Sequence, residues 1–177
     1  MEKLAAKNAT KIIDLLTERL AFERSGVKLY DTLLGRLRAS EDPTLKALLG
    51  DVKEHREEEK EHEEWLEEQI RGLGGDAHAP TERSVLVQAE SEGVERVMRR
   101  DESILHDFHA LLTAELADNA GWDLLVQIAD EFGDSQAKKE FKKRLHEEEK
   151  HLLFVRQTLL ELTKRDVSVL PPSAPPD

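Results

Sequence analysis

The sequence predicts an all-α protein built as a four-helix bundle, in which two antiparallel helix hairpins are joined by a long crossover. Glycine (9 residues), proline (6) and aromatic residues (5%) are scarce among its 177 residues, whereas charged residues make up 36%. This composition is typical of long helices, because strands favour β-branched and aromatic residues. Apolar residues also recur at spacings of three and four, as in helices that bury one stripe in a bundle. The length suits a single domain.

The first hairpin is expected at the start of the chain. We predict its first helix over about 8–38 and its second over about 43–72. The break at 39–43 reads Ala-Ser-Glu-Asp-Pro, which combines N-cap residues with a helix-breaking proline. Gly-Leu-Gly-Gly at 72–75 ends the second helix. Because the connecting loop is short, the two helices are expected to pack side by side and antiparallel.

A long connection precedes the second hairpin. We predict an irregular crossover over about 73–100, with Thr81 or Ser91 as a candidate helix cap. The third helix is expected over about 101–132 and the fourth over about 135–164, with a Gly-Asp-Ser break between them. Such a crossover is long enough to run the length of a bundle. An up-and-down bundle with a loose middle loop is the alternative.

The chain is expected to end in a tail. We predict that residues 1–165 form the bundle domain and that residues 166–177 form a flexible proline-rich tail, because four of the last seven residues are prolines. The short apolar segment Val167–Leu170 is an alternative docking element for a partner.

Composition excludes several functional classes. With no cysteine, the chain cannot form disulfides, thiolate zinc sites or iron–sulfur clusters. A net charge of −12 argues against nucleic-acid binding and suits cations as ligands. No apolar run approaches the roughly 18 residues of a membrane helix, and the N-terminus lacks the apolar core of a signal peptide. We therefore expect a cytoplasmic protein with neither a nucleic-acid nor a membrane partner.

Each predicted helix places a glutamate in its apolar stripe, and two of these glutamates are followed by a histidine three residues later. Residues three apart share one face of a helix, so both side chains can reach one ion. Four buried carboxylates are costly unless they are paired, and two divalent cations would offset their charge. Oxygen and imidazole ligands suit iron or manganese, and zinc can also occupy such a site. The six residues are Glu23, Glu59, His62, Glu115, Glu148 and His151.

An internal repeat supports this interpretation. Glu23 is followed seven residues later by Tyr30, as Glu115 is followed by Trp122, and Glu-Glu-x-x-His occurs at 58–62 and again at 147–151. A single acid-x-x-His pair would carry little weight in a chain with 38 acidic residues and 7 histidines. Two such pairs, each on the second helix of a hairpin, indicate a pseudo-twofold site. Glu102, near the start of the third helix, is a weaker rival to Glu115 because first-turn glutamates commonly act as caps.

On these motifs the chain, over residues 8–164, resembles the ferritin-like di-iron carboxylate proteins, the group of ferritins, bacterioferritins and rubrerythrins. The resemblance implies two iron ions per chain, with manganese or zinc as alternatives. Glu59 and Glu148 would bridge the ions, and Glu23 and Glu115 would be terminal ligands. It also implies catalytic roles for Glu23, Glu59, Glu148 and Tyr30, the last lying beside the ligands. His62 and His151 would give each ion one nitrogen.

The same resemblance implies a function. It predicts O2- or peroxide-dependent iron oxidation of the ferroxidase or peroxidase type, with H2O2 or O2 as oxidant, in iron homeostasis or oxidative defence. We expect a homodimer. The chain lacks the Cys-x-x-Cys module of a complete rubrerythrin and has no short fifth helix after residue 164, which argues against a storage cage. The sequence looks closest to small bacterial ferritin-like proteins.

Two other functions remain open. A dimetal oxidase acting on a small organic substrate would need a pocket beside the ions, and the bulky stripe residues argue against one. A metal-free structural bundle would need Lys or Arg to pair with the glutamates, and the stripes contain none. Asp118 is an alternate ligand, an imidazole partner or a hydrogen-bonded core residue. His55 is expected to bond to a neighbour, with a metal role as the alternative, and Trp122 to pack in the core.

Overall fold

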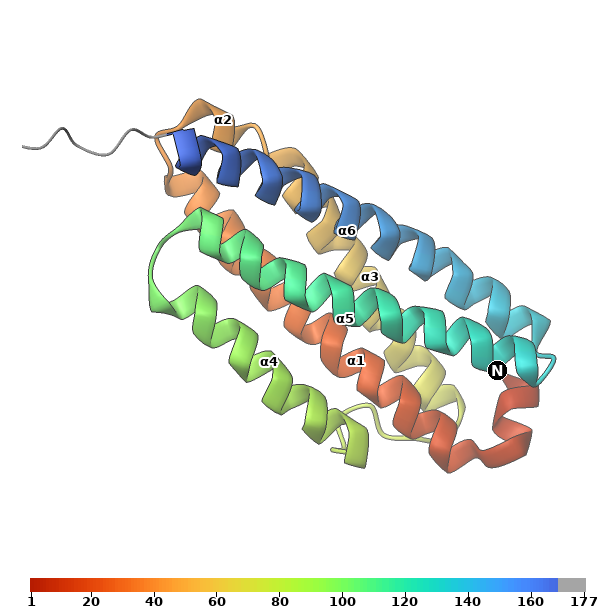
Figure 1. The fold of residues 1–177 in the computed structure, drawn as a ribbon. Helices are drawn as coiled ribbons and strands as arrows, with labels where there is room; N and C mark the ends of the chain where they lie inside the picture. The colour runs from red at the N-terminus through yellow and green to blue at the C-terminus, as the bar shows by residue number, and fades with distance from the viewer. Residues whose placement is uncertain (169–177) are drawn as a thin grey trace, which may run out of the picture.

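The computed structural model describes residues 1–168. Its helices are α1 (Glu2–Ala39), α2 (Pro43–Lys46), α3 (Leu49–Gly72), α4 (Glu82–Arg100), α5 (Ile104–Glu131) and α6 (Ser135–Ser168) (Figure 1). No strand occurs within that range. The prediction of an all-α bundle is confirmed. No helix of the described chain is long and apolar enough to cross a membrane.

Four long helices form the bundle as two hairpins, α1 with α3 and α5 with α6. Helices α3 and α5 run in the same direction, because the chain returns along the bundle through α4 before α5 begins (Figure 1). This arrangement is the crossover topology and not the up-and-down alternative. Helix α4 packs on α1 and α5, outside the four-helix core.

The crossover is helical, and the prediction of an irregular crossover over 73–100 is wrong. Thr81 and Ser84 form a capping box: Thr81 Oγ1 accepts from the Ser84 amide at 3.3 Å, and Ser84 Oγ accepts from the Thr81 amide at 2.8 Å. Only Val87 and Met98 are buried on α4. The helix was missed because one thin apolar stripe among polar residues gives a weak periodic signal.

The ends of the outer helices also differ from the prediction. Helix α1 starts at Glu2, with a kink at Asn8 (φ −164°, ψ 89°). Its first turn docks on the α5–α6 turn, where Asp134 accepts from the Lys3 amide at 3.1 Å and pairs with the N-terminal ammonium at 3.2 Å. Helix α6 continues to Ser168, because no proline occurs between its start at Ser135 and residue 171. Residues 169–177 of the predicted tail lie outside the described range.

Two apolar clusters fill the bundle, one on each side of its middle. The first includes Leu16, Leu20, Leu66, Ile70, Trp122 and Phe141. The second includes Leu29, Leu33, Leu37, Val52, Phe108 and Val155. The buried glutamates and histidines lie between these clusters. The apolar clusters hold the four helices in register and so position one polar layer.

We predict that Asp134→Ala destabilises the fold, because Asp134 caps α6 at the Ala137 amide and anchors the start of α1. Loss of a helix cap costs roughly 1–2 kcal/mol, which chemical denaturation of the metal-free protein would measure. Asp130→Ala is the control, since Asp130 pairs only with Lys138 on the surface. Equal denaturation midpoints for the two variants would contradict this role of Asp134.

Candidate metal centre

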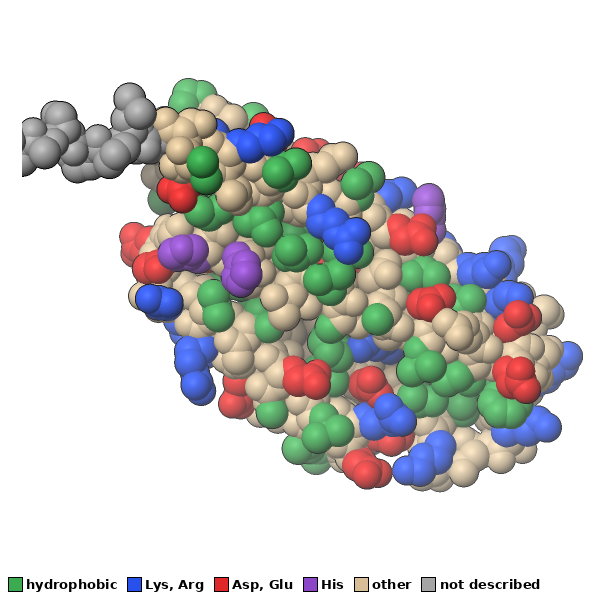
Figure 2. Space-filling model, in the orientation of Figure 1, with side chains coloured by type: hydrophobic (Ala, Val, Ile, Leu, Met, Phe, Trp, Pro, Cys, Tyr) green, Lys and Arg blue, Asp and Glu red, His purple; other side chains and the backbone are tan. Residues whose placement is uncertain are grey.

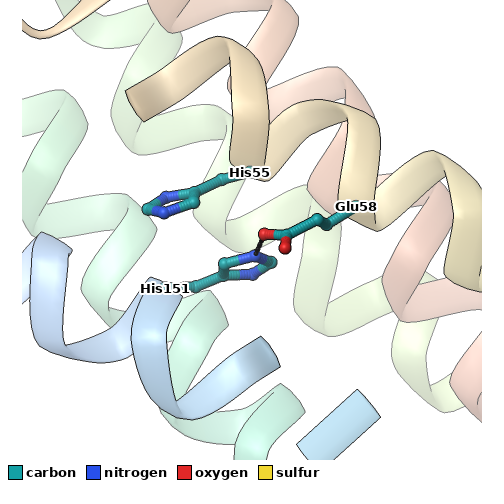
Figure 3. Close-up of side chains that lie close together, drawn as sticks. All are labelled: His55, Glu58 and His151. Atoms are coloured by element: carbon teal, nitrogen blue, oxygen red, sulfur yellow. Dashed lines mark hydrogen bonds and ion pairs between the residues drawn. The ribbon is translucent and has the colours of Figure 1, made fainter. Parts of the chain in front are cut away.

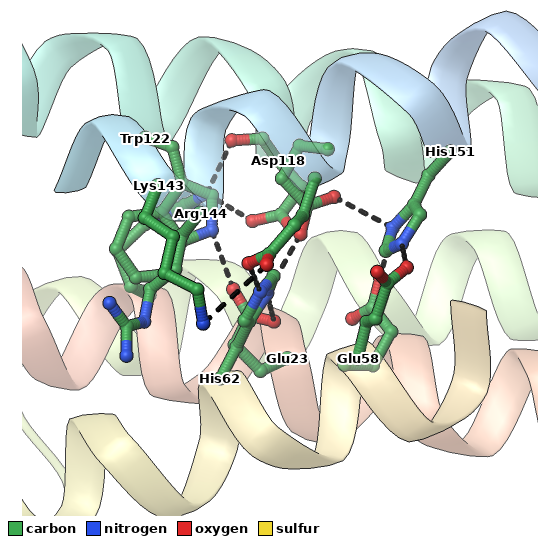
Figure 4. Close-up of polar contacts among 12 residues, drawn as sticks. Glu23, Glu58, His62, Asp118, Trp122, Lys143, Arg144 and His151 are labelled. Carbon is green, nitrogen blue, oxygen red and sulfur yellow. Dashed lines mark hydrogen bonds and ion pairs between the residues drawn. The ribbon is translucent and has the colours of Figure 1, made fainter. Parts of the chain in front are cut away.

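The six predicted ligand residues meet at mid-bundle. Glu23 comes from α1, Glu59 and His62 from α3, Glu115 from α5, and Glu148 and His151 from α6. Each is at least 97% buried. The six side chains meet because each lies on the face of its helix that is buried in the bundle. Figure 4 shows members of this cluster converging from both hairpins.

The cluster divides into two groups that share carboxylates. Glu59, Glu115, Glu148 and His151 each offer a ligand atom, and these atoms all lie within 4.8 Å of one another. Glu148 also forms a group with Glu23 and His62. Glu148 therefore belongs to both groups, and Glu59 additionally lies in a group with Glu23. Glu148 is thus the carboxylate common to the two groups, and Glu59 lies within reach of both Glu148 and Glu23.

Both histidines turn Nδ1 toward the carboxylates. His62 Nδ1 lies 2.9 Å from Glu148 Oε1 and 3.3 Å from Glu23 Oε2. His151 Nδ1 lies 3.2 Å from Glu148 Oε2 and 3.4 Å from Glu59 Oε1. Each imidazole thus presents the same nitrogen to the centre.

The opposite ring nitrogens meet two glutamates that the sequence analysis did not assign a role. His62 Nε2 lies 2.9 Å from Glu147, and His151 Nε2 lies 2.7 Å from Glu58. Each histidine therefore pairs with a glutamate on the opposite helix. A carboxylate on Nε2 holds the proton there and leaves Nδ1 free to bind an ion. The signal was present in the repeated Glu-Glu-x-x-His motif, which was interpreted only as symmetry.

Tyr30 and Trp122 each donate a hydrogen bond to a glutamate of the other hairpin. Tyr30 Oη donates to Glu115 Oε1 at 2.5 Å, and Trp122 Nε1 donates to Glu23 Oε1 at 2.8 Å. Each ring therefore serves the glutamate of the other hairpin. Burial, and then the neighbouring Glu115, raises the pKa of Tyr30, so its hydroxyl stays protonated and continues to donate. Trp122 packs in the core as expected and also donates this hydrogen bond to Glu23.

Asp118 lies beside the centre and is held by a buried arginine. It groups with Glu23, Glu59 and Glu148. Arg19 donates both to its carboxylate and, at 3.0 Å, to its backbone carbonyl. A basic residue thus reaches the interior beside Asp118. None of the four candidate ligand glutamates pairs with a Lys or Arg of the described chain.

Gly26 makes room for Glu59. A Cβ atom at this position would lie 2.2 Å from Glu59 Oε2. Gly26 and Asp118 occupy the same place in the repeat, three residues after Glu23 and Glu115. The pseudo-twofold symmetry is therefore broken here, because one hairpin supplies a space and the other a carboxylate.

His55 packs against the centre without joining it. Its ring centroid lies 4.4 Å from that of His151 (Figure 3). The Phe154 ring meets the His55 ring edge-on. The expected bond to a neighbour is absent, since its Nδ1 has no hydrogen-bond partner within the described range. Burial, and then the adjacent His151, lower its pKa to about 4. His55, Glu58 and His151 could group around an ion, but His151 Nε2 pairs with Glu58 and its Nδ1 faces Glu148 in the main cluster.

The remaining candidates lie away from the centre. Glu102 is exposed ahead of α5, so Glu115 is the residue that reaches the cluster. The exposed histidines are His78, His106, His109 and His146.

Burial and mutual repulsion shift the carboxylates in different directions. Burial, and then Glu148 and Glu23, raise the pKa of Glu59, and burial raises that of Glu115 to about 8. Burial also opposes ionisation of Glu148, but His151 and His62 outweigh it and lower its pKa. Without metal, this centre therefore retains protons on some of its carboxylates.

The histidines complete this pattern. Burial disfavours their charged forms, but Glu23 and Glu148 outweigh it and raise the pKa of His62 and His151, respectively. Without metal, the surrounding carboxylates therefore favour the positively charged form of both imidazoles.

The residues fit a pair of divalent cations. Four buried atoms of the candidate ligands have no hydrogen-bond partner among residues 1–168, although such groups are rare in folded proteins. These atoms are Glu23 Oε2, His62 Nδ1, Glu115 Oε2 and Glu148 Oε1. Carboxylate oxygen and neutral imidazole nitrogen together suit iron or manganese.

Comparison with known proteins identifies the family and the fold of the chain. The family model described as "Domain of unknown function (DUF892)" matches residues 8–168. The chain belongs to this family.

The fold of the chain is ferritin-like. It matches ferritin-like, diiron-carboxylate proteins from Bacillus anthracis strain Ames with a TM-score of 0.66 and 16% identity. This match covers 85% of this chain and 96% of that one. Dps from Thermosynechococcus elongatus matches with a TM-score of 0.62 and 16% identity, over 88% and 94%. Curated protein sequences give no match.

We predict that the metal-free DUF892 protein loses stability as the pH rises from about 6 to 8. Between its ordinary pKa of 4.5 and about 8, folded Glu115 holds more protons than the unfolded chain, so the free energy of unfolding falls with pH. The raised pKa values of His62 and His151 act in the same direction, since their stabilisation is lost as pH rises.

Melting curves of chelator-treated protein would measure this effect. Glu115→Gln should flatten the pH dependence, and Mn(II) should offset the loss at pH 8 because the ion replaces protons. A melting temperature that rises over this window would contradict the assignment.

We also predict that Gly26→Ala weakens metal binding by about tenfold or more, since its methyl group would displace the Glu59 carboxylate. Gly35→Ala is the matched control, because a Cβ there meets nothing within 4 Å. Isothermal titration with Mn(II) would compare the two variants. Equal affinities would show that Glu59 is not positioned through Gly26.

Proposed function

We propose that this chain binds two iron ions between its hairpins and carries out O2- or peroxide-dependent oxidation of the ferroxidase or peroxidase type. The observation that carries the proposal is the set of four buried ligand atoms that form no hydrogen bond within the described residues and that lie in two groups sharing Glu148. Glu23, Glu59, His62, Glu115, Glu148 and His151 are the proposed ligands. The comparisons support it, because one structural neighbour is described as a diiron-carboxylate protein.

Bound iron would supply electrons to O2 or peroxide. The four ligand glutamates would balance the charge of two divalent ions. Glu58 and Glu147 would keep the Nε2 protons of the histidines, so that each Nδ1 lone pair points inward. Tyr30 and Trp122 would each fix one terminal carboxylate and leave its second oxygen for an ion.

The metal-free structural bundle is less well supported. It would need cations of the chain to neutralise the buried glutamates. Within the described range, the buried Arg19 pairs with Asp118, and Arg144 pairs with Glu140 and stacks over Trp65. Neither arginine pairs with the four ligand glutamates, so their charge remains to be balanced by protons or metal.

The cellular setting is also a proposal. We place the activity in the cytoplasm, in iron homeostasis or oxidative defence, with H2O2 or O2 as oxidant. A homodimer is supported by Leu153 and Leu160, which are seven residues apart on α6 and more than half exposed. Residues seven apart lie on one face of a helix, so the two side chains point to the same side of α6.

Anaerobic Fe(II) titration of the metal-free protein tests this function directly. We expect saturation near two ions per chain, followed by O2 or H2O2 consumption coupled to iron oxidation. Glu148→Ala should abolish stoichiometric binding, because Glu148 belongs to both ligand groups. Glu149→Ala, an exposed neighbour on the same helix, should bind as the wild type does. If Glu148→Ala still binds two ions, the ligand set is wrong.

A further inference from the structure

A cavity of about 450 Å³ lies beside the metal centre, enclosed by α1, α4 and α5. Glu59, Glu115 and Asp118 line it at its buried end, and Gly93 and Val97 of α4 line it where it is exposed. This volume falls within the range of roughly 300–1,000 Å³ typical of small-molecule sites. The cavity therefore connects the surface with the carboxylates of the centre.

Small side chains leave this space, and apolar ones surround it. Gly26, Ala110, Ala114 and Ala117 line the cavity together with leucines of α1 and α5. The expectation that bulky stripe residues leave no pocket is wrong, because the space lies between the bundle and α4. Figure 2 views this side of the molecule and shows hydrophobic side chains gathered between α4 and α5.

Helix α4 covers the cavity and is held mainly at its two ends. Near its start, Arg83 pairs with Glu18 at 2.8 Å, and near its end Arg36 donates to the Met98 carbonyl at 2.6 Å. Its two buried residues, Val87 and Met98, lie near these ends. Between them, no hydrogen bond or ion pair joins α4 to another described helix. The middle of α4 is therefore held by side-chain packing, with Val94 packed against the second apolar cluster.

The lining selects the kind of molecule that fits. Apolar walls favour an apolar body, and the carboxylates at the inner end disfavour anions. H2O2 gains nothing from apolar walls, and O2 is far smaller than the cavity. A centre that donates two electrons requires an acceptor group at its inner end.

We propose that this cavity is the binding site for an uncharged organic hydroperoxide, with its apolar body against Leu29 and Leu111 and its O–O group toward Glu59 and Glu115. This assignment rests on the proposed dimetal function and names its substrate class. The hydroperoxide accepts two electrons, one from each of two Fe(II) ions. Its O–O bond breaks, and with two protons it yields one alcohol and one water, while both ions become Fe(III).

Binding to the metal-free protein is the first test. The probe is 2-phenyl-2-propanol, the alcohol that cumene hydroperoxide yields, followed by NMR titration of the full chain. We expect saturable binding, with benzoate at least about tenfold weaker because it is an anion. Gly93→Leu should weaken alcohol binding about tenfold or more, since one misplaced methylene in a hydrophobic pocket is worth about that factor.

Gly35→Leu is the matched control. Both glycines lie within helices, and a Cβ at either meets nothing within 4 Å, but only Gly93 lines the cavity. Ala117→Phe and Ala120→Phe form a second pair on α5, of which only Ala117 lines the cavity. No saturable binding to the wild type, or equal loss in variants and controls, overturns the site.

Reaction of the Fe(II)-loaded protein is the second test. Stopped-flow oxidation under anaerobic conditions should be at least about tenfold faster with cumene hydroperoxide than with H2O2, and Gly93→Leu should lower this ratio while Gly35→Leu does not. Equal rates for the two oxidants, with two ions bound, overturn the hydroperoxide assignment alone. If Fe(II) does not bind, the dimetal function and the hydroperoxide role both fall.

Discussion

Four carboxylates buried in the middle of a helical bundle are the constraint on which the rest of this structure depends. Each would be costly to ionise in an apolar interior, and mutual repulsion adds to that cost. The fold answers with two imidazoles that face the carboxylates, a tyrosine and an indole that donate to them, and a glycine that admits one of them. The apolar clusters on either side lower the local dielectric constant and so strengthen these interactions.

The centre has two unlike faces. On the side of α3 and α6, each histidine is tied to a glutamate of the opposite helix, which closes the site with hydrogen bonds. On the side of α1 and α5, Gly26 and Asp118 stand at equivalent positions of the two hairpins. Both line the cavity that lies beneath α4. The pseudo-twofold repeat therefore brings the six candidate ligand residues together, and the cavity lies where the repeat is broken. Entry through α4 would leave the closed face undisturbed.

Much of the site could be predicted from local pattern. Glu59 and His62 share a helix face because they are three residues apart, and an apolar stripe shows which face is buried. The same reasoning favoured Glu115 over Glu102 as the glutamate of the third predicted helix, and in the structure Glu115 lies in the cluster whereas Glu102 is exposed. It failed for α4, whose stripe has only Val87 and Met98 buried, and for Arg19, which enters the interior because Gly121 leaves space on the facing helix.

By itself, the sequence determined the helices of the two hairpins, their inward faces and the six residues that meet between them. These properties are local, because the spacing of apolar residues along one helix shows which face of that helix is buried. Only the tertiary structure decided which ring nitrogen faces the centre, that Glu58 and Glu147 hold the histidines, and that a cavity lies under α4. These depend on distances between helices, and no spacing along one helix specifies how far away the next one lies.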